Sequence, residues 1–143
     1  NGTYPTKLDT ILKEGLVDYV AMDIKSSYKK YPELIGLSSA PNIIGALLDN
    51  IKKSQEILKN SGIEYEFRTT LVKPLHTEAD IIAMAKEIGP VPKYFIQSFK
   101  DSGDILAGSG EKCQFEAFSK KELDNFINLI QIYVPSVKLR GVD

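Results

Sequence analysis

The sequence of 143 residues contains only one cysteine, Cys113. One cysteine cannot form a disulfide within the chain, and this sparse use of cysteine fits a reducing cytoplasm. A single thiolate also cannot bind an iron–sulfur cluster unless other ligands come from outside the chain. No apolar run is long enough to span a bilayer, and the first residues lack the pattern of a signal peptide. We therefore expect a cytoplasmic protein with no membrane partner.

The chain also lacks an excess of charge of either sign, since 18 Lys and Arg residues stand against 19 Asp and Glu residues. A formal net charge of -1 gives no electrostatic reason to expect a nucleic acid as a partner. The hydrophobic content of 43% and the charged content of 26% are ordinary for a globular protein. A chain of this length suits one domain with a hydrophobic core.

Residues 16–25, Leu-Val-Asp-Tyr-Val-Ala-Met-Asp-Ile-Lys, are the most informative stretch. Their β-branched and aromatic residues, bounded by Gly15 and a Ser-Ser pair, predict a buried strand. Because side chains alternate between the two faces of a strand, one face is apolar and the other ends in Asp23 and Lys25. Buried unpaired charge is unfavourable, so this pair indicates a wet cleft, a ligand or a close ion pair. The alternative is that both side chains leave the sheet and meet only water.

Helical spacing of apolar residues, alternation and turn residues predict the other elements. We expect helices over residues 6–14, 41–60, 77–88 and 119–130, a helical turn over 33–36, and strands over 63–73, 93–99 and 137–139. Thr77 and Asp80 form a capping-box pattern at the start of one helix. Ser119 and Glu122 form another. Residues 101–118 are expected to be a long loop, of a length typical of lids, binding loops or disordered insertions.

The alternation of helices and strands predicts an α/β fold with a largely parallel sheet, since parallel strands need crossover connections. Both an open doubly wound sheet and a part of a β/α barrel fit this order. Helices cover both faces of a doubly wound sheet, so its strands should be apolar on both faces. Here the second strand repeats the pattern of the first, with Glu66 and Arg68 on a polar face. We therefore expect a partial, half β/α barrel, whose exposed strand edge would allow a second copy to pair with it.

Several segments, taken in order, resemble the carboxyl-terminal half of a radical S-adenosylmethionine activating enzyme. They are Asn1-Gly2, Val-Ala-Met-Asp-Ile-Lys at 20–25, Phe-Arg-Thr-Thr-Leu-Val at 67–72 followed by Pro74, and Leu-Arg-Gly at 139–141. The resemblance is to the activating enzymes of anaerobic ribonucleoside-triphosphate reductase and of pyruvate formate-lyase, and it runs over nearly the whole chain. It implies that residues 1–143 are the carboxyl-terminal portion of a radical S-adenosylmethionine partial barrel.

The resemblance also implies an activity. Members of this family bind a 4Fe-4S cluster through three cysteines and cleave S-adenosylmethionine reductively, and the resulting radical takes hydrogen from a glycine of a partner enzyme. It therefore implies S-adenosylmethionine and a 4Fe-4S cluster as cofactors, and a glycyl radical enzyme as the partner. The three-cysteine loop is not in this sequence. We expect it upstream, and we expect the chain by itself to be inactive and to supply no catalytic residue and no metal ligand.

The resemblance assigns cofactor contacts position by position. Asp23 and Lys25 match the strand-end pair that contacts the ribose region of the cofactor. Arg68 and Thr70 match the following strand, which lies beside the cofactor. Gln97 occupies the inward end of the third strand, where relatives approach the adenine. Some relatives carry Pro-Tyr-His there, and this chain does not.

Two other functions remain open from the residues alone. A lysine at the end of a barrel strand also suits a Schiff-base lyase, with Lys25 as the nucleophile. The third reading is a non-catalytic α/β ligand-binding module. Among other candidates, His76 is expected to be a loop residue rather than an acid or base, and Cys113 an incidental thiol. Arg140 either faces the mouth of the cavity or caps the edge of the sheet.

Overall fold

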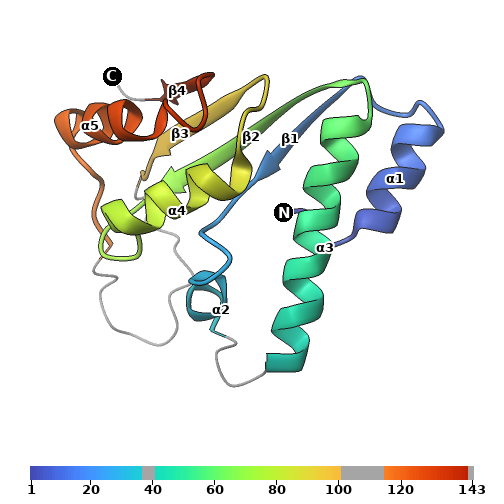
Figure 1. The fold of residues 1–143 in the computed structure, drawn as a ribbon, viewed down its shortest axis with the longest axis horizontal. Helices are drawn as coiled ribbons and strands as arrows, with labels where there is room; N and C mark the ends of the chain where they lie inside the picture. Colours follow the sequence, from blue (N-terminus) through green and yellow to red (C-terminus); the bar gives the residue numbers. More distant parts are fainter. Residues whose placement is uncertain (37–40, 101–114, 142–143) are drawn as a thin grey trace.

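The computed structural model describes residues 1–36, 41–100 and 115–141 (Figure 1). The strands in these ranges are β1 (Tyr19–Asp23), β2 (Glu64–Leu71), β3 (Tyr94–Ser98) and β4 (Val137–Arg140). The helices are α1 (Pro5–Lys13), α2 (Tyr31–Leu34), α3 (Pro41–Asn60), α4 (Glu78–Ile88) and α5 (Lys120–Ile130). Each predicted helix and strand is therefore confirmed, with β1, β2 and β3 shorter than expected and the helical turn α2 two residues earlier than expected. Most of the predicted loop over 101–118 lies outside the described residues.

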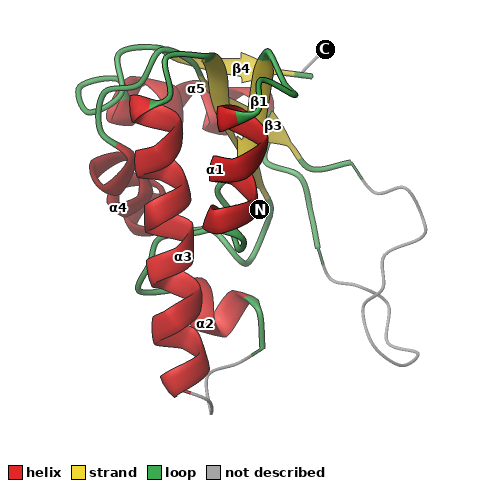
Figure 2. Ribbon diagram, turned by 90° about the vertical axis from the view of Figure 1, so that its right-hand side faces the viewer, coloured by secondary structure: helices red, strands yellow, loops and turns green. Residues whose placement is uncertain are grey.

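All four strands are parallel, and their order in the sheet is β1-β2-β3-β4. Because each crossover moves in the same direction and crossovers are right-handed, the connecting helices fall on the same face of the sheet. Figures 1 and 2 show α3, α4 and α5 on one side of the strands, with α1 packed beside α3. A doubly wound sheet would reverse its order and carry helices on both faces. The α/β fold with a parallel sheet is thus confirmed, and it is compatible with a partial barrel.

The two faces of the sheet differ as the alternation of the sequence predicts. On the helix-covered face of β2, Phe67 and Leu71 are completely buried, and Ile96 of β3 joins them. Leu123 of α5 and Met84 of α4 pack into the same core. On the opposite face, the described residues form no second helical layer. The polar side chains therefore lie on the uncovered side of the sheet.

Two helices begin where their capping boxes predict. In α4, the Thr77 hydroxyl accepts from the main chain of Asp80, whose carboxylate accepts from the main chain of Thr77. Ser119 and Glu122 make the same reciprocal contacts at the start of α5. These caps satisfy amide groups that have no partner within the helix. The Thr77 cap lies where the loop after β2 ends and α4 begins.

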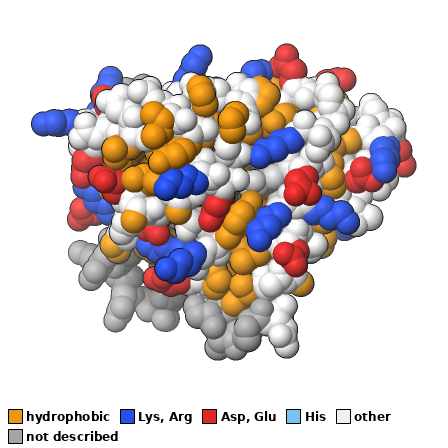
Figure 3. Space-filling view, in the orientation of Figure 1, with side chains coloured by type: hydrophobic (Ala, Val, Ile, Leu, Met, Phe, Trp, Pro, Cys, Tyr) orange, Lys and Arg blue, Asp and Glu red, His pale blue; other side chains and the backbone are white. Residues whose placement is uncertain are grey.

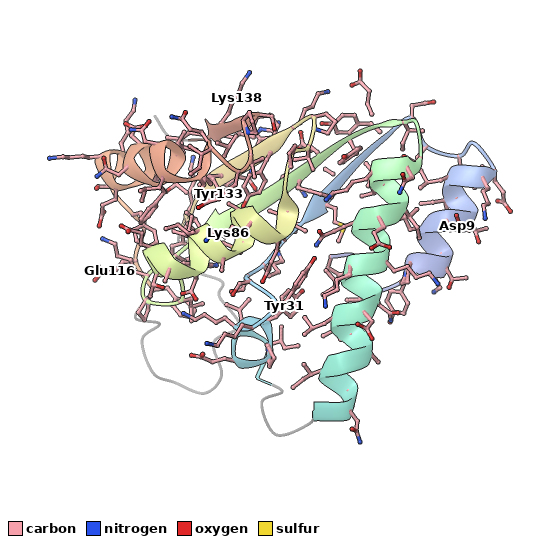
Figure 4. All side chains as sticks on the ribbon, in the orientation of Figure 1. Asp9, Tyr31, Lys86, Glu116, Tyr133 and Lys138 are labelled. Carbon is pink, nitrogen blue, oxygen red and sulfur yellow. The ribbon has the colours of Figure 1, made fainter. Side chains whose placement is uncertain are left out.

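The outer surface of the helical layer carries charges of both signs. Figure 3 shows Lys and Arg side chains interspersed with Asp and Glu over this side. One such cation, Lys86 of α4, lies 5.2 Å from the centre of the Tyr133 ring, so it links α4 to the segment after α5 (Figure 4). None of the helices in the described part of the chain is long and apolar enough to cross a membrane.

One substitution on each face of β2 tests the difference between the two faces. Phe67→Leu leaves a gap in the buried face and is expected to lower the free energy of unfolding by about 1.5 kcal/mol. Thr70→Ala changes an exposed side chain on the uncovered face and is expected to lower it by less than about 0.5 kcal/mol. Urea unfolding followed by circular dichroism measures both values. Equal losses would mean that both faces are covered.

Candidate functional site

Three charged side chains meet near the carboxyl ends of β1 and β2. Asp23 is the last residue of β1, and Arg68 lies directly opposite it in the register of β2. The Arg68 guanidinium donates from Nε to Oδ1 of Asp23 at 3.0 Å, and its Nη2 lies 2.9 Å from the same oxygen. The Lys25 ammonium donates to Oδ2 of Asp23 at 2.9 Å. We call Asp23, Lys25 and Arg68 the strand-end cluster.

The strand-end cluster is open to solvent, with 34% of the Asp23 side chain and 46% of the Lys25 side chain exposed. Partial burial raises the pKa of Asp23, but the hydrogen bond and charge of Lys25, with those of Arg68, outweigh it and leave this pKa below its ordinary value. Asp23 is therefore an ionised acceptor at neutral pH. A carboxylate has more lone pairs, and an ammonium more protons, than these contacts use. Both groups can thus bind a further partner.

Two further predicted site residues lie one step beyond the strand-end cluster. Thr70 of β2 pairs in register with Gln97 of β3. Side chains two residues apart share one face of a strand, so Thr70 lies on the same face as Arg68. Thr70 is exposed and Gln97 is half-buried. The structure therefore brings all five predicted site residues to the uncovered side of the sheet.

A second group of contacts lies closer to the amino ends of β1 and β2 and joins all four strands. The Arg140 guanidinium of β4 donates to both carboxylate oxygens of Glu66 in β2, at 2.6 and 2.8 Å. The Tyr19 hydroxyl of β1 donates to Oε2 of Glu66 at 2.6 Å. Arg140 also stacks on the Phe95 ring of β3, 3.5 Å from its centre. Arg140 thus reaches from the edge strand β4 across the polar face of the sheet to Glu66.

We call Tyr19, Glu66, Phe95 and Arg140 the inner network. The hydrogen bonds from Arg140 lower the pKa of Glu66; burial opposes this effect and the Tyr19 hydroxyl adds to it, so that the pKa lies below its ordinary value. The same contact with Glu66 raises the pKa of Tyr19. Only 5% of the Glu66 side chain is exposed, and both of its oxygens are engaged by the protein. The inner network therefore holds the strands together beside the strand-end cluster.

A buried histidine contacts the main chain of the strand-end cluster, and sequence reasoning missed this contact. His76 lies in the loop before α4, as predicted, but it is almost completely buried. Its Nε2 is 2.9 Å from the carbonyl oxygen of Lys25. The Thr69 hydroxyl donates to the preceding carbonyl, that of Ile24, at 2.8 Å. A loop residue takes part in no periodic pattern, so periodicity could not reveal this contact. The only signal in the sequence is that the single histidine closely follows β2.

The chain is similar to a Methanocaldococcus jannaschii protein named "Putative glycyl-radical enzyme activating enzyme". The two are 30% identical over 135 residues, which cover 89% of this chain and 55% of that protein. The chain thus spans about half the length of this curated relative. Neither a family model nor a solved structure matches the chain.

This similarity supports the expected resemblance to activating enzymes of glycyl radical enzymes in general. It does not distinguish the activating enzyme of ribonucleotide reductase from that of pyruvate formate-lyase. Within residues 1–36, 41–100 and 115–141, no group of three His, Cys, Asp or Glu side chains could hold a metal ion. Cys113 lies outside the described residues. A cavity of about 510 Å³ lies between α1 and α3, on the helix-covered side of the sheet. Neither Asp23 nor Lys25 lines this cavity.

The inner network predicts an acid-sensitive contribution to stability. Glu66→Gln is expected to lower the free energy of unfolding by about 2 kcal/mol at neutral pH, because it weakens charge-assisted hydrogen bonds to a buried group. The ionic contribution is complete above the ordinary glutamate pKa of 4.5 and is lost as the pH falls through the lower pKa of the folded protein. The difference between wild type and variant should therefore shrink below pH 4.5, as measured by urea unfolding at several pH values.

Glu64→Gln is the matched control. Glu64 lies two residues earlier on the same face of β2, and its exposed carboxylate pairs with Lys93 at 2.8 Å. Exposed pairs contribute little to stability, so this variant should lose less than Glu66→Gln at neutral pH. Equal losses from the two variants would contradict the role of the inner network.

Proposed function

We propose that residues 1–143 are the carboxyl-terminal portion of a radical S-adenosylmethionine activating enzyme, and that they bind the nucleoside part of S-adenosylmethionine. The observation that carries this proposal is the strand-end cluster, in which a carboxylate, an ammonium and a guanidinium meet in solvent near the carboxyl end of a parallel sheet. Ligands of α/β proteins bind at this end of the strands. The similarity to the Methanocaldococcus jannaschii protein supports the proposal.

The chemistry of the strand-end cluster fits a ribose. The ionised Asp23 carboxylate is an acceptor for the vicinal hydroxyl groups, and Lys25 has protons left to donate to ribose or carboxylate oxygens. Arg68 keeps Asp23 charged and in place through the contacts at 2.9 and 3.0 Å. A ligand with several hydroxyl groups would therefore find an acceptor in Asp23 and a donor in Lys25.

We assign the adenine to the neighbouring part of the same face. Thr70 and Gln97 lie side by side in register and one step beyond Arg68. A hydroxyl and an amide can each donate and accept hydrogen bonds, as the ring nitrogens and the amino group of adenine require. Thr70 and Gln97 therefore lie next to the proposed ribose contacts, on the β2 and β3 side of the same face. The nucleoside would thus lie across the carboxyl ends of three strands.

The rest of the reaction depends on groups that this chain does not provide. Its single cysteine cannot by itself ligate a 4Fe-4S cluster. When bound, such a cluster supplies the electron for reductive cleavage of S-adenosylmethionine. The role that we propose for Asp23, Lys25 and Arg68 is to bind and orient the nucleoside during that step. The partner that we propose is a glycyl radical enzyme, of the anaerobic ribonucleotide reductase or pyruvate formate-lyase type, and the chain alone would be inactive.

No feature of the site favours the Schiff-base reading. A nucleophilic lysine needs a free amine lone pair. The Lys25 nitrogen instead donates to Asp23 at 2.9 Å. This contact favours a lysine that binds ligand oxygens as an ammonium ion.

Binding of 5′-deoxyadenosine to the full-length protein tests the proposed contacts, because this molecule contains only the nucleoside part. Asp23→Asn and Lys25→Met should each weaken the affinity by roughly 10- to 100-fold, since each removes a charge-assisted hydrogen bond worth about 1.5–3 kcal/mol. Isothermal titration calorimetry gives the dissociation constants. Thermal unfolding of the same samples shows whether each variant is folded.

Asp18→Asn and Lys29→Met are the matched controls. Both residues are exposed and lie close in sequence to the strand-end cluster. Neither change should alter the affinity for 5′-deoxyadenosine by more than about twofold. If Asp23→Asn binds as well as Asp18→Asn, the cluster does not bind the nucleoside and the proposed function is wrong. A plain binding module for another ligand would then be the better reading.

A further inference from the structure

The main chain leaves β1 at the residues that carry the strand-end cluster. Beyond Asp23, the Ile24 amide still donates to the carbonyl of Arg68 at 2.8 Å. The next two carbonyl groups along the chain are held by side chains. The Thr69 hydroxyl donates to the carbonyl of Ile24 at 2.8 Å, and Nε2 of His76 lies 2.9 Å from the carbonyl oxygen of Lys25. The peptide that carries the Lys25 ammonium is thus fixed from β2 and from the loop after it.

The imidazole of His76 is itself fixed. Its Nδ1 lies 3.2 Å from the amide nitrogen of Val72, and the main chain closes the same turn with a bond of 3.1 Å from the His76 amide to the Val72 carbonyl. Nδ1 also lies 3.3 Å from the carbonyl oxygen of Val72, a longer contact than the 2.9 Å between Nε2 and the carbonyl oxygen of Lys25. Because a carbonyl oxygen can only accept, the shorter contact favours the tautomer with the proton on Nε2. Nδ1 is then free to accept from the Val72 amide. Only 5% of His76 is exposed, so both ring nitrogens serve the main chain.

The contact with His76 acts on Lys25 through its peptide group. A lysine side chain has many rotamers and loses considerable entropy when its ammonium is held in one place. A fixed carbonyl restricts the backbone torsion that sets the direction of the Lys25 side chain. The ammonium then starts from a limited set of positions near Asp23, where it is found at 2.9 Å. The entropy cost of ordering the Lys25 side chain when a ligand binds is then smaller.

We propose that His76 is a positioning residue for Lys25, so that a buried imidazole outside the ligand contacts sets the affinity of the strand-end cluster for a hydroxyl-bearing ligand. This inference rests on the proposed function for its affinity measurement and on geometry alone for its spectroscopic test. Acid–base chemistry by His76 is a different role, and it would need a ring nitrogen that can reach the ligand. Here both nitrogens point to the main chain of Val72 and Lys25.

Two variants of similar size separate the contacts of the imidazole. The amide nitrogen of His76→Gln can reach the place of Nε2, so this variant should bind 5′-deoxyadenosine within about threefold of the wild type. The amide of His76→Asn reaches only the place of Nδ1 and loses the Lys25 carbonyl, so it should bind roughly tenfold more weakly. Equal affinities for the two variants in the folded, full-length protein would overturn the inference.

A double-mutant cycle shows whether His76 acts through Lys25. In a Lys25→Met background there is no ammonium to position, so His76→Asn should produce no further loss of affinity. A full additional tenfold loss in that background would mean that His76 has only a general structural role, and it would overturn the inference.

Nuclear magnetic resonance separates this inference from the proposed function. The amide of Ser26 shares its peptide group with the Lys25 carbonyl, so its shift should move in His76→Asn and stay near the wild-type value in His76→Gln. In the wild type, imidazole nitrogen shifts should show the tautomer with the proton on Nε2. The other tautomer in the wild type would overturn the inference even if His76→Asn fails to fold. An unmoved Ser26 amide in a folded His76→Asn would overturn it as well. A wild type that does not bind 5′-deoxyadenosine would instead refute the proposed function.

Discussion

All crossovers of this sheet turn in one direction, and the position of every candidate site residue depends on that constraint. The strand order β1-β2-β3-β4 never reverses, so right-handed connections leave one face without helices. That face does not have to be apolar, because no helix packs on it in the described part of the chain. Asp23 and Arg68 can therefore stay charged and still belong to the sheet. Under a second layer of helices, the same pair would carry a large desolvation penalty.

Asp23 and Glu66 lie on the same uncovered face, and their different burial gives the two carboxylates different roles. Glu66 receives contacts from Arg140 and Tyr19, and only 5% of its side chain is exposed, so burial closes it to a ligand. Asp23 has comparable cationic neighbours but keeps a third of its side chain in solvent. Its partners fix its charge and orientation without using all of its capacity. One carboxylate therefore stabilises the sheet while the other is available to a ligand.

Local patterns were enough to predict most of the fold and part of the site. Strand alternation placed Asp23 and Arg68 on one polar face, and the parallel register of β1 and β2 makes them direct neighbours. Contacts between distant segments could not be predicted in this way. The pair of Glu66 and Arg140 depends on how a side chain of β4 crosses β3, and the contact of His76 depends on the path of a loop. Neither feature leaves a period or a spacing in the sequence.

The inner network has a consequence for the outermost strand. β4 is the short edge strand of the sheet, and edge strands are where local fraying begins. Arg140 crosses the Phe95 ring of β3 to reach Glu66 on β2, so β4 cannot peel away without exposing a charged carboxylate that has lost its partner. Because the pKa of Glu66 lies below its ordinary value, this carboxylate takes up a proton only below pH 4.5. Acid of that strength would remove the contact that holds this edge strand to β2.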